Sequence, residues 1–157
     1  MCGIVGYLGN RQATEVLVEG LSKLEYRGYD SAGVAINIGE ELSVRKFKGR
    51  LQVLADDLNA NPINGGLGIG HTRWATHGEP SDVNSHPHFN KEKTIAVVHN
   101  GIIENYLELR EELQKEGYVF LSQTDTEVVA HLVDKFYEGN LLEAVYKATG
   151  KLRGAYA

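Results

Sequence analysis

The chain has 157 residues, of which 42% are hydrophobic and 24% are charged, a composition that predicts one globular domain with a core of its own. A net charge of −5 and the lack of any basic run argue against a nucleic-acid partner or an acidic membrane surface. No secretory signal, no bilayer-length apolar stretch and a single cysteine lead us to expect a cytoplasmic protein without disulfides.

The first half of the chain alternates apolar runs with turn residues. Its expected elements, in chain order, are a strand at residues 2–8, a helix at 12–24, a polar turn at 25–31, strands at 32–38 and 42–48, and a helix at 51–58. Asn10 precedes the first helix and is its expected cap.

The second half contains more helix. Its expected elements are strands at residues 67–72 and 94–99 and helices at 106–116, 126–136 and 141–149. Thr124 and Glu127 have the spacing of a capping box. Residues 73–92 form a polar loop whose length is typical of functional or disordered loops. Residues 152–157 end on a strand-like run, as if the chain stopped inside a domain. Because the strands occur in runs, we expect a layered α+β fold.

Cys2 is the only cysteine, and it becomes the first residue when Met1 is removed. It then carries a thiol and a free α-amino group, and an amine that titrates near ~8 can accept the thiol proton. The alternative is a small apolar residue that opens the first strand. If Met1 stays in place, the amine belongs to the wrong residue, so the interpretation of Cys2 as a nucleophile depends on its removal.

Two other patterns allow chemical interpretations. The glycines between residues 65 and 70 resemble a phosphate loop, but they lack the dinucleotide spacing and the Walker lysine, so turn and strand formation explains them better. Five histidines cluster at positions 71, 77, 86, 88 and 99. They match no known metal-ligand spacing, so we expect no metal and no cofactor, although a pair between Cys2 and a histidine stays open.

Three polar groups at the ends of expected elements each have two interpretations. Arg73 is a surface residue or a receptor for a carboxylate. Asn100-Gly101 is a turn or a pair of donors for an oxyanion. Asp125 caps a helix or binds an ammonium group. Together with Cys2, these groups describe a pocket for an amino acid with a side-chain amide, whose carbon the thiol attacks.

Longer runs of sequence carry a family resemblance. The start Cys2-Gly3-Ile4-Val5-Gly6 resembles that of the class II glutamine amidotransferases, which are N-terminal-nucleophile hydrolases. Further runs resemble the same family at residues 25–33, 71–78, 99–105 and 124–127. The resemblance extends over residues 2–157, and the runs around Arg27 and Arg73 favour the hexosamine-forming branch over phosphoribosylpyrophosphate amidotransferases and asparagine synthetases.

The resemblance implies a four-layer αββα sandwich and hydrolysis of L-glutamine to glutamate and ammonia. It implies that Cys2 is the nucleophile with its α-amine as base, that Asn100 and Gly101 form the oxyanion hole, and that Arg27 and Gly28 support the nucleophile. The implied glutamine-binding residues are Arg73, Trp74, Thr76, His77 and Asp125.

In the hexosamine-forming branch, ammonia passes to a sugar-phosphate isomerase domain that converts fructose 6-phosphate to glucosamine 6-phosphate in a homo-oligomeric enzyme. Residues 1–157 correspond to the N-terminal part of the amidotransferase domain alone. We therefore expect the chain by itself to make no glucosamine 6-phosphate and to hold the glutaminase site less stably. Two other hypotheses stay open, namely a non-catalytic module that binds glutamine and a metal-dependent hydrolase that uses the histidines.

Overall fold

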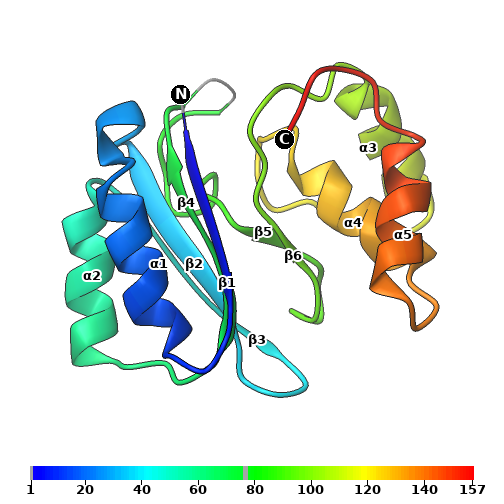
Figure 1. The fold of residues 1–157 in the computed structure, drawn as a ribbon. Coiled ribbons are helices and arrows are strands. Elements are labelled where there is room, and N and C mark those ends of the chain that lie inside the picture. Colours follow the sequence, from blue (N-terminus) through cyan, green and yellow to red (C-terminus); the bar gives the residue numbers. More distant parts are fainter. Residues whose placement is uncertain (1, 76–77) are drawn as a thin grey trace.

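The computed structural model describes residues 2–75 and 78–157, which stack in four layers (Figure 1). Helices α1 (Ala13–Ser22) and α2 (Leu51–Ala60) cover one face of a four-stranded antiparallel sheet. A two-stranded sheet forms the third layer, and helices α3 (Tyr106–Lys115), α4 (Glu127–Phe136) and α5 (Leu141–Thr149) form the fourth. The α+β class and the αββα sandwich are confirmed.

The larger sheet brings three chain segments to one end. It contains β1 (Gly3–Leu8), β2 (Ser31–Asn37), β3 (Leu42–Lys48) and β4 (Leu67–Arg73), in the order β1-β4-β2-β3. Gly3 lies opposite Thr72, and Ser31 lies opposite Arg73. Cys2 and Arg73 therefore meet at the same end of the sheet, beside a short 3₁₀ turn, Glu25–Arg27.

The smaller sheet differs from the expectation. It pairs β5 (His88–Phe89) with β6 (Ala96–Val97), so the strand expected at residues 94–99 is shorter and the loop expected at 73–92 contains a strand. Asn90 explains the difference, because its Oδ1 accepts hydrogen bonds from the backbone N–H groups of Thr94 and Ile95, both at 2.9 Å. A side chain thereby replaces part of the strand ladder.

Apolar side chains pack in two separate cores. One core lies between the larger sheet and α1 and α2, and includes the fully buried Leu17, Leu21 and Leu54. The other lies among α3, α4 and α5, and includes Ile103 and Leu113. The space between the two sheets is polar instead, with the rings of His71, His86 and His88 buried there. Each core holds one half of the molecule together, and the polar layer lies where the halves meet.

Both expected helix caps are wrong. Helix α1 follows Gln12, whose Oε1 accepts a hydrogen bond from the Gly65 N–H at 3.0 Å instead of capping the helix. Thr124 Oγ1 bonds to His88 Nε2 at 2.8 Å rather than capping α4. The Glu127 carboxylate reaches backward, but to the N–H groups of residues 121 and 122. At α4, buried polar partners outcompete the local capping pattern.

The C-terminal run forms no strand of its own. Residues 155–157 lie beside Asn100 and Gly101, where Gly101 and Tyr156 form an isolated antiparallel bridge. Asn100 and Ala157 exchange two backbone hydrogen bonds of 2.8 Å. Among the helices that the structure describes, none combines the length and apolar character needed to cross a bilayer.

Candidate active site

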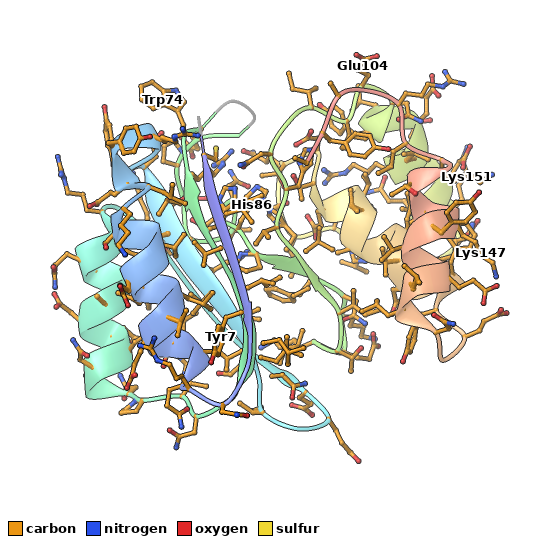
Figure 2. All side chains as sticks on the ribbon, in the orientation of Figure 1. Tyr7, Trp74, His86, Glu104, Lys147 and Lys151 are labelled. Atoms are coloured by element: carbon orange, nitrogen blue, oxygen red, sulfur yellow. The ribbon has the colours of Figure 1, made fainter. Side chains whose placement is uncertain are left out.

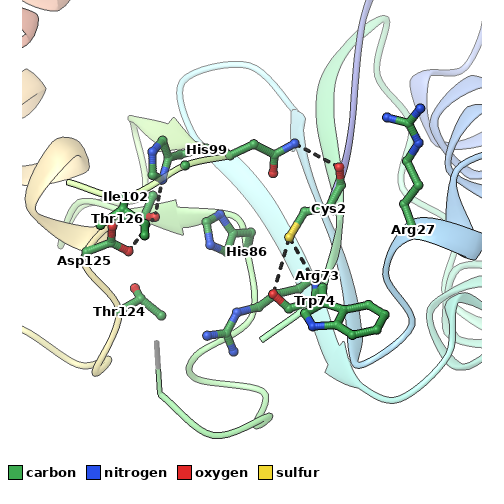
Figure 3. A pocket seen from close by; sticks show the side chains of 12 residues that line it. Cys2, Arg27, Arg73, Trp74, His86, His99, Ile102, Thr124, Asp125 and Thr126 are labelled. Atoms are coloured by element: carbon green, nitrogen blue, oxygen red, sulfur yellow. Dashed lines mark hydrogen bonds between the residues drawn. The ribbon is translucent and has the colours of Figure 1, made fainter. Parts of the chain in front are cut away.

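A cavity of about 390 Å³ opens where the larger sheet ends, between the two halves of the fold. Figure 3 shows Cys2, Arg73 and Trp74 on one side of it and His99, Asp125 and Thr126 on the other. In Figure 2, Trp74 lies at the upper end of the larger sheet, and His86 lies between the two halves of the fold. The lining residues are Cys2, Arg27, Arg73, Trp74, His86, His99, Asn100, Gly101, Ile102, Thr124, Asp125 and Thr126.

The Cys2 sulfur is held by the backbone of the strand end beside it. The Trp74 N–H donates to Cys2 Sγ at 3.1 Å, and the Trp74 carbonyl oxygen lies 3.5 Å from the same sulfur. An N–H donor stabilises a thiolate, and the carbonyl can accept the proton of a thiol. Both forms of Cys2 therefore have a partner at Trp74.

Gly28 permits the close packing that places this donor. A Cβ at position 28 would lie 2.8 Å from the Arg73 carbonyl carbon and 3.0 Å from the Trp74 nitrogen. Gly28 has an extended φ of −166°, so the requirement is space rather than conformation. Asp30 N–H donates to the Arg73 carbonyl oxygen at 3.1 Å and closes the same contact. Arg27, next to Gly28, lines the cavity and donates to the Tyr26 hydroxyl at 2.8 Å.

Asn100 and Gly101 present two N–H donors near Cys2. Asn100 Nδ2 donates to the Cys2 carbonyl oxygen at 3.0 Å, which uses one of its two hydrogens. The backbone N–H groups of Asn100 and Ile102 bond to Ala157 and Ala155. Because backbone groups alternate in direction along an extended segment, the Gly101 N–H points away from residues 155–157 and toward the cavity.

Arg73 is a buried cation on the cavity wall. Its side chain is 4% exposed, and one terminal nitrogen donates to the Gly78 carbonyl oxygen at 3.2 Å. Burial lowers the pKa of Arg73, while the negative charges of Cys2, Asp30 and Asp125 oppose that shift. A guanidinium in such surroundings can form paired hydrogen bonds with a carboxylate that enters the cavity.

Asp125 supplies a buried anion from the other half of the fold. It lies just before α4, and its Oδ2 accepts a hydrogen bond from the Ile103 N–H at 2.8 Å. Its neighbour Thr126 bonds to His99 Nδ1 at 2.8 Å. Burial lowers the pKa of His99, while the negative charge of Asp125 opposes the shift. Arg73 and Asp125 thus bring opposite charges to one cavity, which suits a ligand that carries both an anion and a cation.

The cavity brings together most of the residues singled out from the sequence. Cys2, Arg27, Arg73, Trp74, Asn100, Gly101 and Asp125 line it, and Gly28 packs behind it. Thr76 and His77 lie outside the described residues.

Five lining residues were not expected as site residues from the sequence: His86, His99, Ile102, Thr124 and Thr126. His86 and His99 were singled out only as members of the histidine cluster. His99, Ile102, Thr124 and Thr126 also lie in the runs that carry the family resemblance.

The histidines form a stacked polar layer. The His71 and His86 rings stack with centroids 4.1 Å apart, and His86 meets His88 edge-on at 4.7 Å. Burial is the largest cause of the lowered pKa of each ring, so all three are neutral near pH 7. Within residues 2–75 and 78–157, no three His, Cys, Asp or Glu side chains are grouped so that they could hold a metal ion.

Comparison with known sequences points to one family. The glutamine amidotransferase domain family matches residues 71–157. The glutamine–fructose-6-phosphate aminotransferase (isomerizing) of Clostridium perfringens is 66% identical to this chain over 157 residues, which is 100% of the chain and 26% of that protein. A protein of the same name from Thermus thermophilus is 58% identical with the same coverage. The chain therefore spans about a quarter of the length of these relatives.

Two solved structures share the fold. The Bacillus subtilis glutamine phosphoribosylpyrophosphate amidotransferase, in complex with ADP and GMP, matches with a TM-score of 0.84 and 29% identity over 100% of this chain and 34% of that one. A structure described as the allosteric regulatory enzyme of purine biosynthesis matches with a TM-score of 0.86 and 30% identity, with the same coverage. The fold is therefore shared with two solved structures that are only 29% and 30% identical to this chain.

Proposed function

The chain belongs to the glutamine amidotransferase domain family, and on that premise we propose that Cys2 hydrolyses L-glutamine to glutamate and ammonia in the cavity described above. One observation carries the proposal. A thiol, two N–H donors, a buried guanidinium and a buried carboxylate line a single cavity, and they come from separate segments between Cys2 and Asp125. Each group alone has an ordinary structural explanation, but their convergence matches the parts of one substrate.

The substrate is held by its two charged ends. Arg73 binds the α-carboxylate of glutamine, and Asp125 binds the α-ammonium group, with its other oxygen fixed by the Ile103 N–H. Both side chains are buried, where charge-assisted hydrogen bonds are strong because water competes less. With these ends fixed, the side-chain amide of glutamine reaches toward Cys2.

The first half of the reaction releases ammonia. Once Met1 is removed, the α-amine of Cys2 accepts the proton of its own thiol, and the thiolate attacks the amide carbon of glutamine. The carbonyl π electrons move onto oxygen, which accepts hydrogen bonds from Asn100 Nδ2 and the Gly101 N–H. As the carbon–nitrogen bond breaks, the α-ammonium group returns its proton to the leaving nitrogen, so ammonia departs and a γ-glutamyl thioester remains on Cys2.

The second half regenerates the enzyme. The α-amine of Cys2 accepts a proton from a water molecule, which attacks the thioester carbon and re-forms an oxyanion in the same hole. The carbon–sulfur bond then breaks, and the sulfur recovers its proton from the α-ammonium group. Glutamate leaves, and Cys2 is again a thiol hydrogen-bonded to Trp74.

The proposal also includes the molecule that accepts the ammonia. The 66% identity to an enzyme named glutamine–fructose-6-phosphate aminotransferase, against 29% to a phosphoribosylpyrophosphate amidotransferase, favours fructose 6-phosphate as the acceptor. In this proposal, residues 1–157 carry the N-terminal part of the amidotransferase domain, and the sugar-phosphate half-reaction needs residues beyond these 157. A cytoplasmic location and a homo-oligomeric complete enzyme belong to the same proposal.

The experiment compares ammonia release from glutamine by the complete protein, processed to begin at Cys2, and by its Cys2→Ala variant. We expect the variant to bind glutamine, measured by calorimetry, and to release no ammonia above background. Equal rates for the two proteins would reject Cys2 as the nucleophile. If both proteins bind glutamine and neither releases ammonia, the chain is a non-catalytic binding module. Adding fructose 6-phosphate and measuring glucosamine 6-phosphate tests the acceptor separately.

A further inference from the structure

Asn100 is held from two sides, and one of its two partners has no part in the reaction described above. Its Nδ2 donates to the Cys2 carbonyl oxygen at 3.0 Å, and its Oδ1 lies 2.9 Å from His71 Nε2. His71 is 1% exposed and lies on β4, where it pairs with Ile4 on β1 and Gly33 on β2. A ring on a strand paired on both sides has little freedom to shift.

The direction of the bond between Asn100 and His71 follows from the bond to Cys2. A carbonyl oxygen only accepts, so the Asn100 amide nitrogen must face Cys2 and its oxygen must face His71. That oxygen has no hydrogen to give, so the donor is His71 Nε2. The Nδ1 atom of His71 has no partner of good geometry among the described residues, although the His99 carbonyl lies near the ring. The neutral ring therefore carries its one hydrogen on Nε2.

The ring that supplies this donor is itself fixed. His86 stacks on His71 with ring planes 14° from parallel, and His88 contacts His86 edge-on. His88 is anchored in turn by the bond between its Nε2 and Thr124 Oγ1. The three rings form a continuous series of contacts from Thr124, just before α4, to the side-chain oxygen of Asn100.

We propose, on the basis of the glutamine hydrolysis proposed above, that His71 is the positioning residue of the oxyanion hole. Its Nε2–H fixes the Asn100 amide so that the second Nδ2 hydrogen faces the oxygen that becomes negative. Without His71, the amide can rotate and present its own oxygen to the developing charge. Loss of a whole oxyanion donor costs about 10²–10³-fold in kcat, so loss of its orientation alone should cost roughly 10- to 100-fold.

The test uses two substitutions in the complete protein. His71→Leu removes the donor while keeping an apolar group of moderate size, and His71→Gln can place an N–H near the position of Nε2. We expect His71→Leu to lower kcat for glutamine hydrolysis by roughly 10- to 100-fold with KM within about twofold, because Arg73 and Asp125 still hold the substrate. His71→Gln should recover most of the loss.

Three further measurements test positioning by His71 against a general structural effect. Alkylation of Cys2 by iodoacetamide develops no oxyanion, so its rate should be unchanged in both variants. In an Asn100→Ala background, His71→Leu should lower kcat no further, because the two residues act as one unit. Nitrogen chemical shifts of the His71 ring should show the hydrogen on Nε2.

Several outcomes would overturn the proposal. The first two are a normal kcat for His71→Leu and an equal loss of kcat in His71→Leu and His71→Gln. The others are a Cys2 alkylation rate that falls by the same factor as kcat, and a further loss of kcat when His71→Leu is added to Asn100→Ala. A hydrogen found on Nδ1 would also overturn it. If glutamine hydrolysis by Cys2 is itself wrong, the Cys2→Ala variant will still release ammonia. A normal His71→Leu beside an inactive Cys2→Ala rejects only the role of His71.

Discussion

Gly101 forms an antiparallel bridge with Tyr156, and this pairing turns the Gly101 N–H away from residues 155–157, in the wall of the cavity that Cys2 also lines. The backbone of Gly101 has a φ of +131°, a conformation that favours glycine. A Cβ at this position would also press against the Ala155 carbonyl oxygen. Glycine is therefore required here both by conformation and by space.

Gly101→Ala should lower both stability and activity. We expect a loss of about 2–3 kcal/mol in the free energy of unfolding and a fall in kcat, because the bridge must open and the N–H loses its direction. Gly117→Ala is the matched control, since Gly117 also has a positive φ, +95°, but a Cβ there meets nothing within 4 Å. The control should cost about 1 kcal/mol and leave kcat unchanged. Urea unfolding and ammonia release measure both effects, and equal results for the two variants would contradict the account.

Asp125→Asn should weaken glutamine binding without disturbing the fold. The asparagine oxygen can still accept the Ile103 N–H, but the negative charge is gone. Loss of a charge-assisted hydrogen bond costs about 1.5–3 kcal/mol, so KM for glutamine should rise roughly 10- to 100-fold.

A substrate without the α-amine provides the control for Asp125. Wild-type protein should discriminate strongly between glutamine and 4-carbamoylbutanoate, whereas Asp125→Asn should treat the two almost alike. If the variant still prefers glutamine by the wild-type factor, then Asp125 does not bind the ammonium group.

The buried histidines should make the protein sensitive to mild acid. Burial is the main reason that the pKa of His71 falls to about 4, against about 6.5 in the unfolded chain, and the hydrogen bond to Asn100 and the nearby His99 backbone only partly oppose it. Below pH 6.5 the unfolded chain binds the proton first, so stability is complete above that pH and declines as the pH falls toward 4. His71 alone contributes a loss of about 3 kcal/mol by pH 4.

Urea unfolding at a series of pH values between 7.5 and 4 checks this prediction. His71→Gln should flatten the slope of unfolding free energy against pH, because glutamine does not titrate. His86 and His88, whose pKa values burial also lowers, should account for much of the remaining slope. An identical slope in wild type and His71→Gln would show that His71 does not contribute.

The sequence predicted the parts of the fold that local pattern determines. The strand at 42–48 and the helix at 141–149 have the expected bounds, because apolar periodicity and turn residues mark both clearly. Strand β5 was missed because its pairing depends on hydrogen bonds to the Asn90 side chain, and asparagine in a sequence favours a loop. The Thr124 cap failed because its partner, His88, lies 36 residues away.

The same distinction holds for the candidate site. Cys2, Arg73, Asn100 and Asp125 were predicted because each carries a chemical group at the end of an element and because together they match one substrate. His71 was singled out as one of five histidines and as the first residue of the run 71–78, but without a role of its own. Its bond to Asn100 spans 29 residues and depends on how β4 lies beside Cys2, which no local pattern reveals.

The most direct test of the central claim is the mass of the complete protein, processed to begin at Cys2 and quenched with acid during turnover of glutamine. We expect an added γ-glutamyl group on residue 2, located by peptide mapping and removed by hydroxylamine, as a thioester would be. We also expect that protein that retains Met1 forms no such adduct, because its Cys2 has no free α-amine. Ammonia release without any adduct on Cys2, or full activity with Met1 in place, would contradict the account.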